Sequence, residues 1–120
     1  MPRIGTASDV HEPSRRARIV DLAEEMRQRP EREYQLGKAA ERAFLSVSQF
    51  TTQFRQLTGC TFHQYLLKCR VDAAKSWFAK DKSISSVARK VGFSSAQLLA
   101  DAFRRIVGKT VNEWREDGFK

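Results

Sequence analysis

The chain contains an internal repeat, and this repeat limits the possible folds more than any other feature of the sequence. A shift of 48 positions aligns apolar residues with one another: Leu36 with Ile84, Ala39 with Val87, Ala40 with Ala88 and Leu45 with Phe93. A shift of 49 continues the match: Ser46 with Ser95, Phe50 with Leu99, Phe54 with Phe103, Arg55 with Arg104, Leu57 with Ile106, Gly59 with Gly108 and Tyr65 with Trp114. Each copy has the order short helix, tight turn, capped helix and glycine stop, so we expect two copies of one helical unit.

Apolar residues at helical spacing predict seven helices, and no segment alternates as a strand would. The expected helices lie at residues 14–29, 36–43, 47–58, 62–79, 84–91, 96–107 and 111–116. Capping serines and proline or glycine stops define most of their ends: Ser14, Ser46 and Ser95 at the starts, and Pro30, Gly59, Gly92 and Gly108 at the ends. In the helix after Ser95, we expect Leu99, Phe103 and Ile106 to face the core.

Two helices joined by a few residues describe a helix-turn-helix, and the repeat supplies two of them. The fold expected is therefore all-α, with two helix-turn-helix subdomains joined by a long linker helix. Residues 1–12 are expected to form a flexible leader, 13–79 the first subdomain with the linker helix, and 80–120 the second subdomain. At about 1.5 Å per residue the linker spans about 25 Å, which could hold two helices near the roughly 34 Å spacing of adjacent major grooves.

The excess of basic residues lies in the C-terminal part of the chain. Residues 1–35 hold seven basic and seven acidic side chains, whereas residues 36–120 hold fifteen basic and seven acidic ones, so the net charge of +8 belongs entirely to the C-terminal 85 residues. This distribution favours a polyanionic partner, nucleic acid rather than a membrane surface. The sequence shows no signal peptide and no membrane span, which predicts a cytoplasmic, nucleoid-associated protein.

Several motifs resemble a known family. They are Ser46 to Phe54 followed by Thr58-Gly59, then Gln64-Tyr65-Leu66 with Arg70 and Ala74, and Val91-Gly92-Phe93-Ser94-Ser95 with Ala102-Phe103-Arg104-Arg105. Together they resemble the DNA-binding domain of the AraC/XylS transcription regulators, over residues 14–115. The resemblance implies a bilobal all-α fold, sequence-specific binding of double-stranded bacterial promoter DNA, and activation through contacts with RNA polymerase.

Carried over by position, the resemblance assigns base-facing residues to both units. In the first unit they are Ser48, Gln49, Thr51, Thr52 and Arg55; in the second they are Gln97, Leu98, Ala100, Asp101 and Arg104. Nearby basic residues are expected to meet phosphates: Lys38, Arg42, Lys90, Arg105 and Lys109. Thr52 and Asp101 stand where the family often has Arg, and Leu98 and Ala100 offer no hydrogen bond to a base. The second unit is therefore expected to contribute less to specificity.

Other departures concern the framework of the fold. Phe44 stands where the family commonly has Gly in the first turn, while Phe62 and Val111 stand where Pro commonly opens a helix. Arg70 is expected to be structural, with its head group bonded to a helix end. These are variations that the fold is expected to absorb.

Enzymatic and metal-binding functions find little support. Cys60, His63 and Cys69 are too few for a zinc site, and both cysteines are interpreted as buried or half-buried thiols, so we expect no enzyme, cofactor or metal. The alternative function is a helical protein–protein adaptor that uses the Leu98 face and has a degenerate second DNA-contacting unit.

A monomer is favoured over an oligomer. A stand-alone regulator and a fragment of a longer one both stay open, although Met1 and the leader favour the former.

Overall fold

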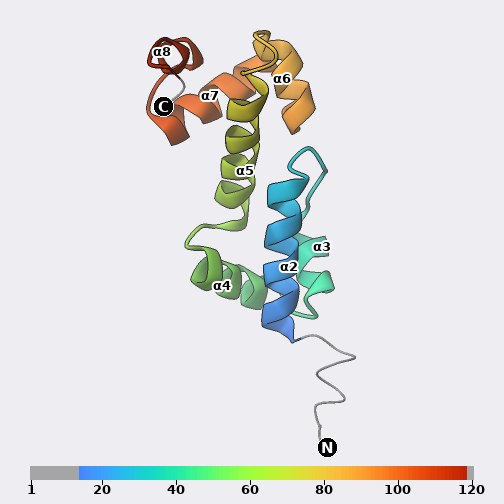
Figure 1. Cartoon of the computed structure of the whole chain (residues 1–120). Coiled ribbons are helices and arrows are strands. Elements are labelled where there is room, and N and C mark those ends of the chain that lie inside the picture. Colours follow the sequence, from blue (N-terminus) through green and yellow to red (C-terminus); the bar gives the residue numbers. More distant parts are fainter. Residues whose placement is uncertain (1–13, 119–120) are drawn as a thin grey trace, which may run out of the picture. The chain divides into compact units, whose positions relative to one another are not determined.

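The computed structural model describes residues 14–118, and within this range it contains seven helices and no strand. The helices are α2 (Arg15–Gln28), α3 (Leu36–Arg42), α4 (Val47–Thr58), α5 (Phe62–Trp77), α6 (Ile84–Val91), α7 (Ala96–Val107) and α8 (Val111–Glu116) (Figure 1). The all-α prediction is confirmed, and the helix ends agree with the expected ones within two residues. The predicted leader, residues 1–12, lies outside the described residues.

Contacts divide the chain into two compact units. Among the described residues, unit 1 contains 14–25 and 34–62, and unit 2 contains 26–33 and 63–118. The long helix α5, which the sequence analysis grouped with the first subdomain, thus belongs to unit 2 after its first residue. The reason is packing, because the buried side of α5 joins the hydrophobic core of α6, α7 and α8.

Unit 1 is built by α2, α3 and α4 around an aromatic cluster. Phe50 and Phe54 on α4 are fully buried, and both rings lie against Phe62, with centroids 5.8 and 5.6 Å from it. The hydroxyl of Ser46 accepts a hydrogen bond from the backbone N–H of Gln49, which fixes the start of α4. Gly59 ends the helix in the left-handed conformation, at φ 79°.

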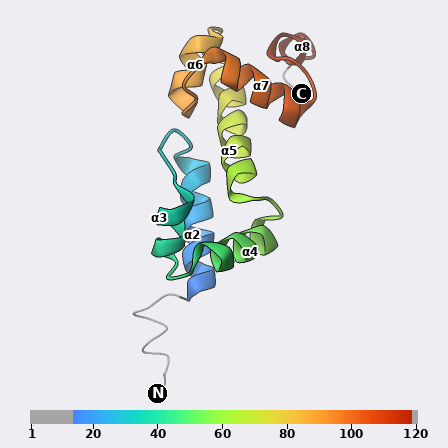
Figure 2. The ribbon, with the colours of Figure 1, turned by 180° about the vertical axis from the view of Figure 1, so that it is seen from behind.

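Unit 2 places α6, α7 and α8 around the C-terminal end of α5 (Figure 2). Its core contains a second aromatic cluster, in which the Phe103 ring lies 6.1 Å from Phe78 and 5.5 Å from Trp114. Phe103 and its counterpart in the first copy, Phe54, are both fully buried, as the repeat predicts. The expectation for Ile106 is wrong, because this side chain is 37% exposed and the following residue, Val107, packs against the core instead.

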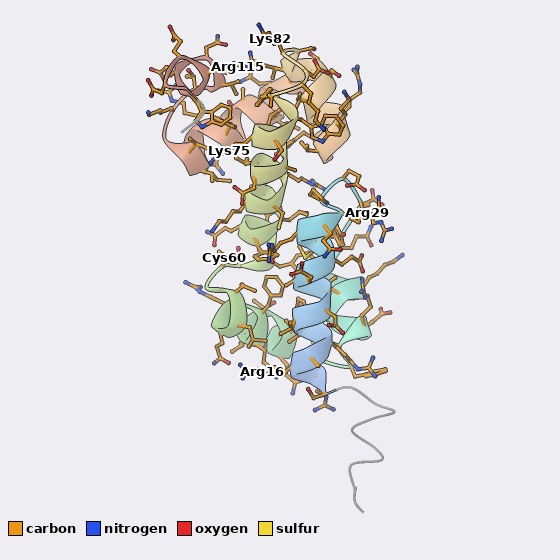
Figure 3. The ribbon with its side chains drawn as sticks, in the orientation of Figure 1. Arg16, Arg29, Cys60, Lys75, Lys82 and Arg115 are labelled. Atoms are coloured by element: carbon orange, nitrogen blue, oxygen red, sulfur yellow. The ribbon has the colours of Figure 1, made fainter. Side chains whose placement is uncertain are left out.

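Two arginines connect segments within unit 2 through backbone carbonyls. Arg70 on α5 donates from Nε to the carbonyl of Pro30 at 2.8 Å and from Nη2 to that of Arg32 at 2.9 Å, so the predicted structural role is confirmed. Arg115 on α8 donates to the carbonyl of Lys82 at 2.8 Å, and the two residues lie close together in Figure 3. Both contacts stabilise turns that follow helix ends.

The turns of the two copies differ at one aligned position. Phe44 has a φ of 58°, and Gly92, its counterpart at a shift of 48, has a φ of 102°. This left-handed conformation explains why glycine suits the position, since it is strained for a side chain with a Cβ atom. Phe44 is 65% exposed, and the guanidinium carbon of Arg18 lies 4.3 Å from its ring centroid.

Candidate nucleic-acid interface

The predicted base-facing residues of the first unit form one exposed face of α4. Their side chains are all exposed, opposite the buried Phe50 and Phe54; these residues are Ser48, Gln49, Thr51, Thr52 and Arg55. The aromatic side of α4 is buried within unit 1, and its opposite side forms an exposed polar strip that carries hydroxyl, amide and guanidinium groups. Hydroxyls can donate to or accept from several bases, so this strip has the chemistry of major-groove contact.

Gln49 has a second role in that strip. Its side-chain oxygen Oε1 accepts from the backbone N–H of Ser46 at 3.1 Å and completes a capping box at the start of α4. This bond occupies the oxygen that a two-point contact with adenine would use. The Ser-x-x-Gln spacing, which is typical of a capping box, is the sequence signal for this role, and the role itself was not predicted.

The corresponding face of α7 is less polar. Gln97, Leu98, Asp101 and Arg104 are exposed and Ala100 is half-buried. Leu98 is 49% exposed, and the amide of Gln97 donates to the Asp101 carboxylate at 2.8 Å. The structure therefore brings these five predicted residues onto α7, but two of them bond to each other and two are apolar.

Two hollows in unit 2 flank this face of α7. One, of about 370 Å³, is lined by residues of α5, of the α6–α7 turn and of α7, including His63, Leu98 and Arg105. The other, of about 270 Å³, is lined by residues of α6, α7 and the start of α8, including Arg104 and Asn112. His63 and Asn112 were not predicted at this surface, since only the packing of α5 and α8 beside α7 places them there.

The five predicted phosphate contacts differ in how they are engaged. Arg42 pairs with Glu25 at 3.0 Å, Lys90 with Asp81 at 3.1 Å, and Lys109 with Asp117. Within residues 14–118, by contrast, Lys38 and Arg105 have no ion-pair partner, and both are exposed. A phosphate would therefore have to compete with a carboxylate for Arg42, Lys90 and Lys109. Lys38 and Arg105 are available to a phosphate without such competition.

Lys90 is held most firmly of the three. Its ammonium lies 4.5 Å from the ring centroid of Trp77, in addition to its contact with Asp81. The Asp81 carboxylate also accepts from the Ser86 hydroxyl at 2.6 Å and from the Ser83 backbone N–H at 2.9 Å. These hydrogen bonds, with that of Ser86 the strongest cause, lower the pKa of Asp81 to about 2. The network stabilises the start of α6.

The two thiols agree with the interpretation from the sequence. Cys60 is half-buried and Cys69 is buried. Burial is the main cause that raises the pKa of the Cys69 thiol to about 11, which makes it a poor nucleophile. Among residues 14–118, no group of three or more His, Cys, Asp or Glu side chains is arranged to hold a metal ion.

Comparison with known proteins decides the family. A family described as a helix-turn-helix domain matches residues 39–117, which is more than half of the chain. The chain belongs to the AraC-type family of helix-turn-helix domains. This confirms the resemblance drawn from the motifs around Ser46 and Val91, and with it the prediction of two helix-turn-helix units.

Relatives in this family are DNA-binding transcription regulators and not enzymes. The chain is 42% identical over 74 residues to the probable transcriptional regulator LumQ of Photobacterium leiognathi, covering 61% of the chain and 30% of the relative. It is 32% identical over 83 residues to the transcriptional activator RhaR of Escherichia coli strain K12, covering 68% of the chain and 29% of the relative. The chain thus spans about 30% of the length of these curated relatives.

Solved structures show the same fold. The DNA-binding domain of the global transcriptional factor AdpA, in complex with a target DNA, matches with a TM-score of 0.74 and 28% identity, over 87% of this chain and 92% of that one. An AraC-type transcriptional regulator from Chromobacterium violaceum matches with a TM-score of 0.70 and 24% identity, over 85% of this chain and 89% of that one.

No helix within residues 14–118 is long and apolar enough to span a membrane.

Proposed function

We propose that the chain binds double-stranded DNA in a sequence-specific manner, through its two helix-turn-helix units, and regulates transcription. The observation that carries the proposal is the exposed polar strip of α4, which follows a capped helix start and a tight turn in a protein of this family. The AdpA domain, which was solved with its target DNA, supports the same mode of binding. The net charge of +8 in residues 36–120 supplies the attraction to phosphates.

The first unit supplies most of the base contacts in this proposal. Ser48, Thr51, Thr52 and Arg55 have exposed groups that can bond to base edges, while Gln49 contributes mainly through its cap. In the second unit, Gln97 and Arg104 are the polar candidates, and Leu98, Ala100 and Asp101 add little attraction. Lys38 and Arg105 are the first choices for phosphate contacts because neither has to leave a carboxylate.

One chain supplies two DNA-contacting helices, so a monomer can occupy two adjacent major grooves. Along the chain, the 16-residue helix α5 lies between the two DNA-contacting helices α4 and α7, and at about 1.5 Å per residue it is about 24 Å long. A site with two contacted segments about one helical turn apart is the expected footprint. We further propose that the chain activates transcription through contacts with RNA polymerase at a promoter, in the bacterial cytoplasm and in association with the nucleoid. The relative RhaR, a transcriptional activator, supports activation.

Selection of bound fragments from a random double-stranded library, followed by footprinting, tests the proposal directly. We expect one enriched motif with two protected segments, and a binding constant that falls steeply with salt. If about six phosphates are neutralised, the slope of log K against log salt is roughly −5. A slope near zero, or no enriched motif, would contradict DNA binding or its specificity, respectively.

A protein-binding adaptor is the second candidate, and the 49% exposure of Leu98 favours it. In that case, a partner protein would be retained by the purified chain after nuclease treatment and lost from the Leu98→Asn variant. The variant Thr51→Ala with Thr52→Ala would instead keep such a partner while it lowers affinity for the selected DNA site, which separates the two functions.

A further inference from the structure

The larger hollow of unit 2, which we call the α5–α7 hollow, combines an apolar lining with positive charge. Its volume of about 370 Å³ lies within the range of small-molecule sites, about 300 to 1,000 Å³. The apolar lining consists of Leu67, Phe93, Leu98 and Ala102. Phe93 and Ala102 are buried and Leu67 is half-buried, so this part is fixed by the core. An apolar molecule that enters the hollow would bury part of the exposed Leu98 side chain, which favours binding.

The charged side chains of the hollow favour an anion. Arg70 and Arg105 line it, together with His63 and a single carboxylate, Asp101. Asp101 already accepts the hydrogen bond of Gln97, whereas Arg105 has no ion-pair partner within the described part of the chain. The hollow therefore has two guanidinium groups and one carboxylate. Arg105, which is more exposed than Arg70, is the available partner for an acidic group.

Arg70 gives the hollow a fixed wall. Its guanidinium is held by the carbonyls of Pro30 and Arg32, at 2.8 and 2.9 Å, and lies 5.9 Å from the ring centroid of Phe93. A side chain that is already fixed loses little conformational freedom when a ligand arrives. Gly92 lines the same wall, and a Cβ atom built on it would lie 2.8 Å from Nε of Arg70. The wall is therefore closely packed before any ligand binds.

We propose that the α5–α7 hollow binds a small amphipathic anion, which has an apolar body and a carboxylate or sulfonate head. The body lies against Leu98 and the apolar lining, and the head pairs with Arg105. Leu98 and Asp101 also belong to the face of α7 assigned to DNA, so the ligand and DNA compete; this second part rests on the proposed function. The site itself requires no DNA.

The probe for the test is 8-anilinonaphthalene-1-sulfonate, whose fluorescence rises when it leaves water. We expect one molecule to bind per chain. Leu98→Asn and Arg105→Gln should each weaken binding about tenfold, because each removes one of the two interactions. Both side chains are exposed, so neither change should disturb folding, which thermal melts would check.

Matched controls lie outside the hollow. Ile106→Asn changes another exposed apolar residue of α7, and Arg89→Gln removes another exposed arginine of unit 2, so both should bind the probe as the wild type does. The uncharged N-phenyl-1-naphthylamine, which keeps the apolar body, should bind about tenfold more weakly than the sulfonate. Equal affinity in all four variants, or equal affinity for the uncharged compound, would overturn the anion site.

Adding a selected DNA site to the probe complex tests the competition. Displacement of the probe supports it, while simultaneous binding would overturn competition and leave the ligand site in place. If the chain binds the probe but no DNA at all, the proposed function fails and the site stands. The two conclusions are therefore tested separately.

Discussion

The side-chain amide of Gln97 donates a 2.8 Å hydrogen bond to the carboxylate of Asp101, one turn further along α7. The bond gives the carboxylate one partner but leaves its negative charge on an exposed face. If this face enters the major groove, the charge approaches two rows of phosphates. Their repulsion acts on every DNA sequence, whereas acceptance of a hydrogen bond from a cytosine amino group would act at one base position only.

We expect repulsion to dominate, because neighbouring Leu98 and Ala100 add no base contact. Asp101→Ala should tighten binding to selected and random DNA alike, roughly threefold, and Asp101→Arg should tighten both further. Affinities measured for both variants at one salt concentration would show this. Weaker binding of Asp101→Ala at the selected site, with relaxed preference at one position, would instead identify Asp101 as a cytosine contact.

Thr51 and Thr52 should carry base specificity, because their exposed hydroxyls lie in the middle of the α4 strip. Replacing both by alanine should cost roughly 1 to 3 kcal/mol at the selected site and little on random DNA. Competition binding with the two DNAs measures the difference. The double variant Ser85→Ala with Ser76→Ala, at exposed positions outside the interface, is the control. Equal losses on both DNAs would show that the threonines only position the protein.

Gly92 should tolerate alanine far less well than Gly108, although both adopt a positive φ. A Cβ atom at Gly92 would lie 2.8 Å from Nε of Arg70 and 3.0 Å from the carbonyl oxygen of Pro30, whereas one at Gly108 would meet nothing within 4 Å. Gly108→Ala should lower the free energy of unfolding by about 1 kcal/mol, from backbone strain alone. Gly92→Ala should lower it by about 3 kcal/mol, because steric overlap is added. Urea denaturation measures the free energy of unfolding of both variants. Equal decreases in the two would contradict a role for the close packing at Gly92.

The low pKa of Asp81 predicts an acid-dependent loss of stability. In the folded state this pKa is about 2, below its ordinary value of 3.8, so the ionised carboxylate stabilises the folded chain above about pH 4. That contribution is lost as the pH falls from about 4 to about 2. Unfolding measured over this range should therefore be less pH-dependent in Asp81→Asn than in the wild type. Ser86→Ala, which removes the strongest hydrogen bond to the carboxylate, should change the profile in the same direction; identical profiles in all three would contradict the role of this network.

Helix boundaries were predictable because the residues that end helices act locally. Ser46 and Ser95 bond to backbone N–H groups three residues later, and Gly59 and Gly108 adopt the left-handed conformation at helix ends. These interactions depend on a few neighbouring residues, so the sequence contains all the information needed. For the second helix of each copy, the repeat then gave independent support, since both copies carry a serine cap and a glycine stop there.

Interactions across long sequence separations could not be predicted in this detail. Arg70 was expected to bond to a helix end, but its actual partners, the carbonyls of Pro30 and Arg32, lie about 40 residues earlier and follow from packing. Lys90 was assigned to phosphate from its charge, although its contacts with Asp81 and Trp77 could be known only from the folded unit. Gln49 is a different case. Its Ser-x-x-Gln spacing already indicates a capping box in the sequence, and the cap uses the same side-chain oxygen as the predicted base contact.

The contrast between Phe44 and Gly92 means that the two copies of the repeat are not interchangeable. In the first copy, the turn opens to solvent, and a phenylalanine persists there at φ 58° under the guanidinium of Arg18. In the second, the same site faces Arg70 and the carbonyl of Pro30, where no side chain fits. A chimeric chain with the first turn grafted into both places would fold its first unit and lose its second. A side chain is therefore accommodated at this position in the first copy and excluded from it in the second, by the same arginine that holds the neighbouring segment in place.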